Sequence, residues 1–384
     1  SCPDFRKNTL GTCKHILHVL EKVAKRFPKS VRQKPYVPES LAVHLSYGEE
    51  LELRMIVPDN LPDLAKVLVR PIESRAITDL RDLLSRIRRL EASGHDVLLY
   101  PDAEEYINDA LMREGLRSTT DEIRQDPAAH PLRRTLLETE LLPYQMDGIA
   151  FAAGAGRAIL ADDMGLGKTI QGIGVAELLA REAGISRVLI VCPASLKAQW
   201  RLEIERFSKR ECRLVIGGAK DRAKQYESPS FFTICNYEQV VRDINAIEAA
   251  PWDLIILDEG QRIKNWEAKT SRVIKGLRSR FALVLSGTPL ENRLDDLFSI
   301  VEFIDDRRLG PAFRFFNRYR VTDGSGKVLG YKNLENLRER LAPILLRSRT
   351  SSISSWRRRG ERSSCSRSGP RCSTWWSPCL TAGP

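Results

Sequence analysis

Between residues 136 and 306, short apolar runs alternate with longer segments of helical periodicity, and this rhythm constrains the fold more than any other feature. The runs occupy residues 158–161, 188–191, 214–216, 232–235, 254–257 and 283–285. Several are apolar at every position, which is typical of strands buried on both faces of a parallel sheet. The sequence therefore predicts an α/β fold, with a mainly parallel sheet flanked by helices and with ligands at the carboxyl ends of the strands.

A glycine-rich segment follows the first run and leads into a helical pattern over residues 170–180. Its members are Asp162, Asp163, Met164, Gly165, Leu166, Gly167, Lys168 and Thr169. Such a loop lets backbone N–H groups approach phosphate oxygens at a helix N-terminus. We expect residues 163–169 to bind ATP, with Lys168 at the β- and γ-phosphates and Thr169 as a ligand of Mg²⁺. A glycine-rich helix cap is the alternative, because Asp162 stands where the general pattern has glycine.

An acidic pair, Asp258 and Glu259, directly follows the apolar run at 254–257. Beside a phosphate loop, Asp258 can hold Mg²⁺ through water, and Glu259 can orient or activate the attacking water. Lys168, Asp258 and Glu259 are therefore the candidate catalytic residues. A solvated turn at the end of a strand is the alternative.

Small and hydroxyl-bearing residues follow the run at 283–285, namely Ser286, Gly287 and Thr288. They are candidates for relaying the state of the nucleotide to a nucleic-acid site. A loop punctuated by glycine and proline is the alternative interpretation.

Taken together, these motifs resemble those of the helicase-like superfamily that includes Swi/Snf chromatin remodellers and their bacterial relatives. The resemblance spans about residues 140–347 and is carried by the segments 142–148, 163–171, 192–200, 236–238, 258–265 and 286–289. It implies a RecA-like first motor lobe that hydrolyses ATP and tracks along double-stranded DNA. In that family Asp is tolerated at the position of Asp162, and the glutamine at the position of Gln145 contacts adenine.

The resemblance also implies nucleic-acid contacts, and two alternative functions remain open beside the one that it implies. Pro193, Ser195, Asn236 and Tyr237 lie in motifs that face DNA in the family, and phosphate contacts of that kind weaken with salt. One alternative is a nucleotide-gated DNA-binding module with little turnover, and another is a relative of RNA or strand-separating helicases. No apolar run is long enough to span a membrane. The resemblance to bacterial members of the family implies a cytoplasmic, nucleoid-associated bacterial protein.

Cys2, Cys13 and His15 form a possible zinc-ligand set at the beginning of the chain. Two thiolates and an imidazole suit Zn²⁺, although a structural site needs four ligands. The spacing resembles a SWIM zinc finger whose first cysteine would precede Ser1, so the site is expected to be incomplete. Two free cysteines and a surface histidine are the alternative.

The chain divides by composition into five segments. These are a partial zinc finger with a helix (1–29), an accessory α+β region (30–135), the ATP-binding lobe (136–306), a helical extension (307–347) and an Arg/Ser-rich tail (348–384). The net charge is +11, but eight Arg and one Glu from residue 347 onward supply +7 of it. The remaining +4 is a weak signal for nucleic acid, so that inference depends on the motifs.

The segment from residue 348 departs from the family pattern, in which a second motor lobe would follow. That lobe supplies arginines that stabilise the transferring phosphate, an effect on the order of a thousandfold in related NTPases. Its absence predicts weak or no turnover. A shifted reading frame in a GC-rich gene is our hypothesis for the tail, and an Arg/Ser-rich nucleic-acid-binding arm is the alternative.

Overall fold

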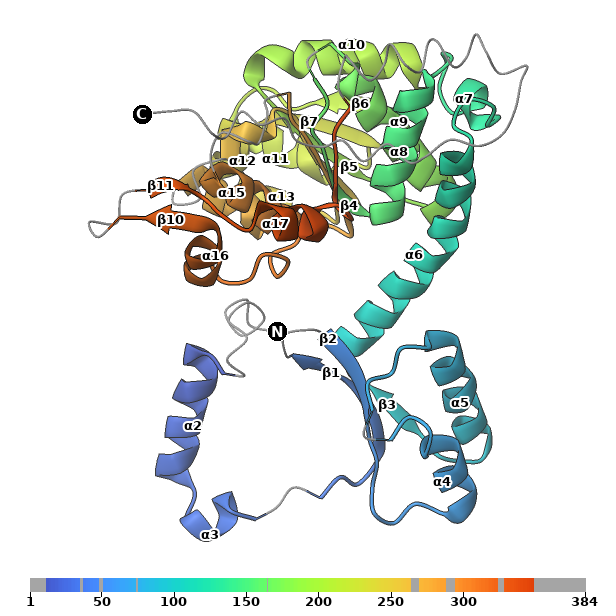
Figure 1. Cartoon of the computed structure of the whole chain (residues 1–384), viewed down its shortest axis with the longest axis vertical. Coiled ribbons are helices and arrows are strands. Elements are labelled where there is room, and N and C mark those ends of the chain that lie inside the picture. The colour runs from blue at the N-terminus through green and yellow to red at the C-terminus, as the bar shows by residue number, and fades with distance from the viewer. Residues whose placement is uncertain are drawn as a thin grey trace. The chain divides into compact units, whose positions relative to one another are not determined.

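The computed structural model describes residues 12–34, 37–47, 51–73, 75–163, 165–263, 269–287, 294–323 and 328–348 (Figure 1). Its contacts divide the chain into two compact units, Ser1–Met112 and Arg113–Pro384. The division falls inside helix α6 (Pro101–Gln125), earlier than the boundary expected at residues 135 and 136. One uninterrupted helix therefore belongs to both units, and a change in composition does not reveal that.

The first unit is a small α+β structure. Its sheet has the order β2-β1-β3, in which β1 (Leu41–Tyr47) pairs antiparallel with β2 (Leu51–Ile56) and parallel with β3 (Val97–Leu99). The unit also contains the helices α2 (Lys14–Arg26), α3 (Lys29–Arg32), α4 (Asp63–Val69) and α5 (Leu80–Ala92). Val43, Leu53, Leu83 and Leu90 belong to a hydrophobic core whose buried members all lie in this unit.

The second unit contains a seven-stranded sheet of order β12-β4-β9-β8-β5-β7-β6, in which every neighbouring pair is parallel. The strands are β4 (Arg157–Leu160), β5 (Val188–Cys192), β6 (Cys212–Leu214), β7 (Phe232–Asn236), β8 (Leu254–Leu257), β9 (Phe281–Leu285) and β12 (Leu345–Leu346). All residues of β5, β8 and β9 are buried, as continuous apolar runs require. The predicted α/β fold with a parallel sheet is confirmed.

One strand differs from its predicted position. The apolar run at 214–216 predicts a strand there, but β6 ends at Leu214. Gly217 turns the chain with a φ of 89°. The side-chain amide of Gln225 accepts a hydrogen bond from the backbone N–H of Ile216 and donates one to its carbonyl, each at 2.9 Å. The apolar run therefore continues past the strand into a turn.

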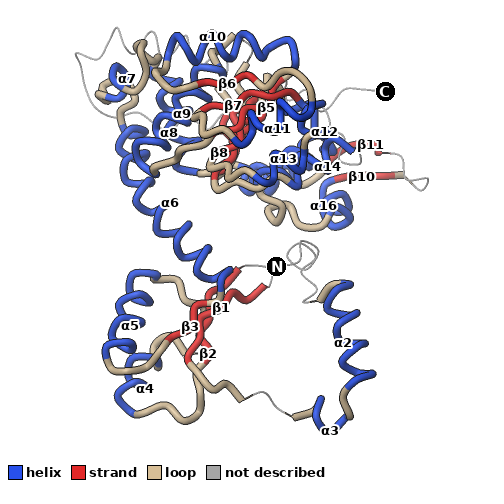
Figure 2. Tube along the Cα trace, turned by 180° about the vertical axis from the view of Figure 1, so that it is seen from behind, coloured by secondary structure: helices blue, strands red, loops and turns tan. Residues whose placement is uncertain are grey.

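Helices cover both faces of the sheet, as the two opposite views show (Figures 1 and 2). They are α8 (Pro143–Ala155), α9 (Lys168–Ala183), α10 (Lys197–Phe207), α11 (Ala219–Glu227), α12 (Tyr237–Arg242), α13 (Ile244–Ala249), α14 (Lys269–Gly276) and α15 (Leu294–Ile304). Short helical turns complete the unit: α7 (Leu132–Thr135), η1 (Ala194–Leu196) and η2 (Gly260–Ile263). The helices exclude water from the apolar strands, which is the main stabilisation of this architecture.

The segment 307–347, expected to be a helical extension, contains strands as well as helices. Besides α16 (Ala312–Tyr319) and α17 (Leu334–Leu341), this segment forms the antiparallel hairpin β10 (Arg320–Thr322) and β11 (Val328–Tyr331) and the sheet strand β12. The predicted turn at 323–326 lies, apart from Asp323, outside the described residues. Backbone N–H groups of Ile159 and Ala161 donate to the carbonyl groups of residues 344 and 346, at 2.7 and 2.8 Å. This edge of the sheet thus gains a partner that helical periodicity does not reveal.

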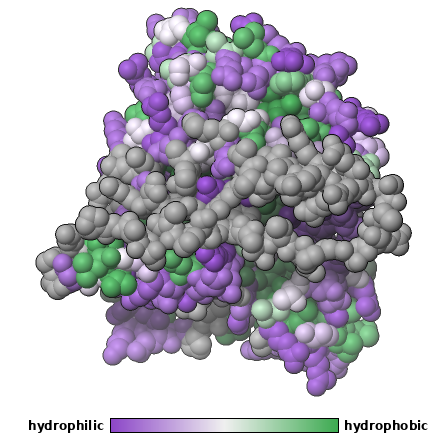
Figure 3. All heavy atoms as spheres, turned by 45° about the horizontal axis from the view of Figure 1, so that its top comes forward, coloured by the Kyte–Doolittle hydropathy of each residue, from purple (hydrophilic) through white to green (hydrophobic). Residues whose placement is uncertain are grey.

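The surface seen in Figure 3 mixes hydrophilic and hydrophobic side chains outside the grey segment. Among the described residues, no helix combines the length and the apolar character needed to cross a membrane.

Candidate nucleotide site

Three of the predicted motifs meet at one edge of the sheet because β9 lies between β4 and β8. The phosphate loop follows β4, Ser286 follows β9, and the acidic pair follows β8. Ser286 bonds to residues beside the other two motifs: its backbone N–H donates to the carbonyl of Leu160, the last residue of β4, at 3.0 Å, and its hydroxyl donates to Oε1 of Gln261, shortly after the acidic pair, at 3.2 Å. The structure therefore brings together segments that are about 90 residues apart in the chain.

The phosphate loop turns through Gly167, whose φ of 72° lies in the left-handed region. A Cβ at this position would be 2.7 Å from Nε2 of Gln145, so only glycine fits without a rearrangement. Tyr144 and Gln145 of α8 donate to the carbonyl of Leu166, at 3.1 and 3.4 Å. Gln145, predicted to select adenine, thus also supports the loop. Met164 lies outside the described residues.

Lys168 is folded over its own loop. Its ammonium donates to the backbone carbonyl groups of Asp162 and Asp163, at 3.0 and 3.1 Å. Thr169 is half-buried in the first turn of α9, one residue further on. The charge and the hydroxyl predicted to bind phosphate and Mg²⁺ therefore both lie at the N-terminus of a 16-residue helix, where anions are favoured.

Asp162 has a structural role that explains why it can replace a glycine. Its buried carboxylate accepts hydrogen bonds from Nε2 of Gln171 at 2.8 Å and from the backbone N–H of Ser348 at 2.6 Å. Burial raises the pKa of this carboxyl, while the bonds from Gln171 and Ser348 and the charge of Lys168 oppose that rise. The side chain thus joins the phosphate loop to the segment that follows β12.

The acidic pair is held rigidly. Asp258 is buried, and its carboxylate accepts from Nε1 of Trp200 at 2.7 Å and from the backbone N–H of Glu259 at 2.9 Å. Desolvation raises the pKa of Asp258, which the bond from Trp200 and the charge of Lys168 partly offset. Glu259 has the unusual φ of 52° and accepts a hydrogen bond from the amide of Gln261. A left-handed non-glycine residue beside a buried carboxylate is typical of a functional turn.

These oxygen-bearing groups fit a magnesium–nucleotide complex. Mg²⁺ prefers hard oxygen ligands and is commonly held by one or two carboxylates together with substrate phosphates. The carboxylate of Asp258 and the hydroxyl of Thr169 are groups of this class. Lys168 acts on Asp258 electrostatically, so the positive and negative halves of the predicted site lie in one neighbourhood.

Four residues predicted to contact nucleic acid lie at the ends of two neighbouring strands, β5 and β7. Ser195 is exposed, Asn236 is half-buried and Pro193 is buried. Tyr237 requires a correction: its side chain is buried, and its hydroxyl donates to the backbone carbonyl of Asp258 at 2.6 Å. A side chain engaged inside the lobe does not present its ring to a bound strand.

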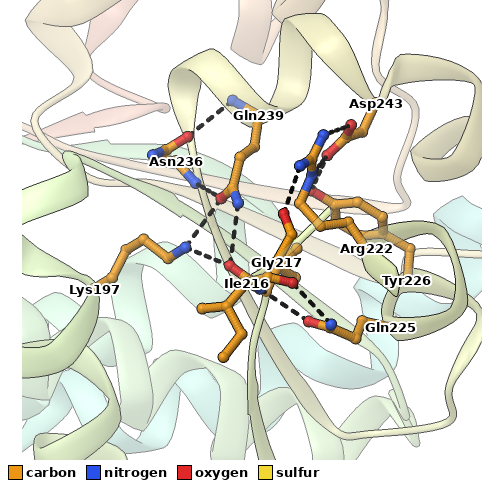
Figure 4. A network of polar contacts seen from close by, with 10 residues as sticks. Lys197, Ile216, Gly217, Arg222, Gln225, Tyr226, Asn236, Gln239 and Asp243 are labelled. Atoms are coloured by element: carbon orange, nitrogen blue, oxygen red, sulfur yellow. Dashed lines mark hydrogen bonds and ion pairs between the residues drawn. The ribbon is translucent and has the colours of Figure 1, made fainter. Parts of the chain in front are cut away.

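A polar network supports these strand ends (Figure 4). Asn236 and Gln239 cap α12 reciprocally, with bonds of 2.8 and 3.0 Å. Lys197, a buried amine whose pKa desolvation lowers, donates to the carbonyl of Val215 and to Oε1 of Gln239, at 2.5 and 3.0 Å. Sequence patterns single out Asn236 because of its motif. They do not reveal Lys197, which looks like an ordinary solvated lysine.

The possible zinc ligands are only partly described. Cys2 lies outside the described residues, so the three-residue set stays a prediction. Cys13 is buried, and its sulfur accepts a hydrogen bond from the backbone N–H of Ile16 at 3.5 Å as the cap of α2. His15 is exposed. Among residues with defined positions, no group of three or more potential ligands is placed to hold a metal ion.

A family model described as the SNF2-related domain matches residues 144–356, which is more than half of the chain. The match ends at residue 356, beyond residue 348, where the sequence is predicted to depart from the family pattern. Ser286, Gln145 and the acidic pair all lie inside the matched range.

Similar proteins are much longer than the region they share with this chain. The chain is 32% identical over 233 residues to Helicase ssl-1 of Caenorhabditis elegans, covering 55% of this chain and 10% of that protein. It is 35% identical over 218 residues to the putative ATP-dependent helicase/translocase YwqA of Bacillus subtilis, covering 54% and 23%. A SWI2/SNF2 ATPase core of Sulfolobus solfataricus in complex with dsDNA is 30% identical, with a TM-score of 0.49 and coverage of 56% and 45%.

Proposed function

The chain belongs to the SNF2-related family, and on that premise we propose that it contains the nucleotide-binding lobe of an ATP-dependent motor that acts on double-stranded DNA. The observation that carries the proposal is the meeting of the phosphate loop and the acidic pair at one edge of the sheet, with Ser286 bonded to residues that flank each of them. Relatives whose names state helicase or translocase activity support it.

We assign each residue a task in binding and hydrolysis. Lys168 balances the charge of the β- and γ-phosphates, Thr169 and Asp258 hold Mg²⁺, and Glu259 orients the attacking water. Bound Mg²⁺ would neutralise charge that develops on the phosphate oxygens. Glu259 suits its task because its left-handed backbone and its bond to Gln261 fix the direction of its carboxylate. Gln145 donates a hydrogen bond to the phosphate loop, so a contact between this side chain and adenine would depend on the position of the loop.

The proposal extends to the rest of the chain. Ser195 and Asn236 would contact the DNA backbone from the ends of β5 and β7, so binding should be independent of sequence and should weaken with salt. We also propose the five-segment organisation, a SWIM-type ancestry for the set Cys2, Cys13 and His15, and a bacterial nucleoid location. Weak turnover is expected wherever a second motor lobe supplies no arginines to the phosphates.

The test is ATP turnover by this chain with no nucleic acid, duplex DNA, single-stranded DNA or RNA, beside Lys168→Ala. We expect turnover that is weak, that duplex DNA stimulates more than the other polymers do, and that falls to background in Lys168→Ala. Equal stimulation by RNA would favour a strand-separating relative instead. Turnover that is unchanged in Lys168→Ala would refute the proposed site.

A nucleotide-gated DNA-binding module is the second candidate. The bond between the carboxylate of Asp162 and the backbone of Ser348 favours it, because the phosphate loop is tied to the segment that leaves the lobe. Such a module would bind Mg-ATP in a manner that depends on Lys168 and would change its affinity for duplex DNA, but it would release no phosphate above background.

A further inference from the structure

We propose that Trp200 and Tyr237 are positioning residues that connect the two predicted DNA-facing elements to Asp258, the carboxylate assigned to Mg²⁺. This inference rests on the proposed function and adds to it the path by which DNA and nucleotide affect each other. Each of the two elements places one side-chain hydrogen bond on Asp258.

The first connection comes from α10. Ser195 lies in η1, directly before this helix, and Trp200 lies one turn into it. The indole is 1% exposed, and its Nε1 donates to Oδ2 of Asp258 at 2.7 Å. If a bound DNA strand displaces η1 and α10, the indole N–H that donates to the buried carboxylate of Asp258 moves with them. Hydrogen bonds to a charged acceptor are strong, so this movement would affect Asp258.

The second connection comes from α12. Asn236 caps this helix, and Tyr237 is its first residue. The tyrosine ring is 2% exposed, and its hydroxyl donates to the backbone carbonyl of Asp258 at 2.6 Å. Side chain and backbone of the same aspartate are thus fixed from two different helices.

Trp200 also touches the helix that follows the phosphate loop. A Cβ added at Gly172 of α9 would be 3.0 Å from Cη2 of Trp200. The indole therefore packs closely against α9 while its N–H binds the loop after β8. The position of Trp200 therefore depends on α9 and on Asp258. A movement of either of them would move Trp200 and the helix α10 to which it belongs.

Two further bonds hold Asp258, one to β5 and one from the residue that follows it in the chain. Its backbone N–H donates to the carbonyl of Val191 at 2.9 Å, and Oδ1 accepts from the N–H of Glu259 at 2.9 Å. Val191 belongs to β5, which the sheet holds in place, and Glu259 follows in the chain. Trp200 and Tyr237 are therefore the side-chain connections from α10 and α12 to Asp258, beside the backbone bond to β5, the strand that Pro193 and Ser195 follow.

The experiment measures equilibrium binding of a fluorescent ATP analogue to the whole chain, titrated with Mg²⁺ and repeated with saturating duplex DNA. Trp200→Phe removes the donor but also ring volume, so a second variant replaces the indole with benzothiophene, which keeps the shape and lacks the N–H. Tyr237→Phe removes only a hydroxyl. Binding without Mg²⁺ serves as the internal reference for each variant.

Matched controls lose equivalent bonds elsewhere in the lobe. Trp252→Phe loses an indole bond to the carbonyl of Ile247 at 2.8 Å, and Tyr319→Phe loses a hydroxyl bond to Asn336 at 2.8 Å. Both rings are buried, with 6% and 0% exposure. A general loss of stability would affect these variants as much as those at Trp200 and Tyr237.

We expect both Trp200 variants to raise the Mg²⁺ concentration for half-maximal binding by roughly tenfold, because a hydrogen bond to a charged group is lost. Tyr237→Phe should abolish most of the effect of duplex DNA on nucleotide affinity, and the controls should match the wild type. If the variants at Trp200 and Tyr237 bind nucleotide like the controls, with the same dependence on Mg²⁺ and DNA, the proposed connection is wrong, while the nucleotide site itself is unaffected. A wild type whose nucleotide affinity is indifferent to DNA would also overturn the proposed connection. A wild type that binds no nucleotide would instead refute the proposed function.

Discussion

At the scale of single residues, Gly260 shows how tightly the acidic loop is built. A Cβ there would be 2.2 Å from Cγ1 of Val284, a fully buried side chain in β9. Because the β-branched valine has little rotamer freedom, we expect Gly260→Ala to lower the free energy of unfolding by about 1–3 kcal/mol. Urea denaturation measures this. Gly276→Ala is the control, since nothing lies within 4 Å of its Cβ, and an equal loss in both variants would contradict the account.

Two buried thiols, Cys192 and Cys235, and the half-buried thiol of Cys212 provide a second prediction at this scale. Desolvation raises the pKa of Cys212 and of Cys235 to about 12, and it raises the pKa of Cys192 further. The thiolate is the reactive form, so these three cysteines should resist iodoacetamide at pH 8 in the folded protein and react after denaturation. Peptide mass spectrometry reads each site separately. Rapid labelling of Cys235 in the native state would show that β7 is not buried as described.

At the scale of secondary-structure elements, a two-bond ion pair fastens α11 to the end of α12 (Figure 4). The guanidinium of Arg222 donates to both carboxylate oxygens of Asp243 at 2.6 Å and to the carbonyl of Gly217 at 2.8 Å. The side chains are 12% and 6% exposed. Breaking such a pair leaves a buried charge without its partner.

We therefore expect Arg222→Met to lower the free energy of unfolding by about 3 kcal/mol, near the lower end for buried pairs because Arg222 keeps some exposure. The matched control is Arg201→Met, which breaks a solvent-exposed pair with Glu205 and should change the free energy of unfolding much less. Urea unfolding of the two variants and the wild type measures the difference. Similar losses in both variants would mean that the pair does not fasten these helices.

At the scale of the whole molecule, the two units have separate hydrophobic cores. We expect residues 113–384 alone to unfold cooperatively and to bind Mg-ATP with an affinity within about twofold of the whole chain, because the phosphate loop, the acidic pair and their supports all lie in this unit. Circular dichroism and nucleotide titration check this. A fragment that is folded but binds nucleotide more than tenfold more weakly would show that the first unit contributes to the site.

The positions of most sheet strands and of the glycine-rich loop depend on local sequence patterns and can be predicted from them. Continuous apolar runs predicted five of the sheet strands near their observed places, and glycine with lysine predicted the phosphate loop. The bonds from Trp200 to Asp258 and from Ser348 to Asp162 join residues 58 and 186 positions apart, and no periodicity encodes such pairs. The sequence motif places Tyr237 on the DNA surface for the same reason: it gives the position of the residue in the chain but not the direction of its hydroxyl.

The central claim is that Lys168 and Asp258 belong to one nucleotide site. Equilibrium binding of ATP, with and without Mg²⁺, to the wild type, Lys168→Ala and Asp258→Asn tests it most directly. We predict that Mg²⁺ strengthens ATP binding by the wild type, that this gain disappears in Asp258→Asn, and that Lys168→Ala weakens binding in both conditions. An Asp258→Asn variant that keeps the full Mg²⁺-dependent gain would contradict the claim.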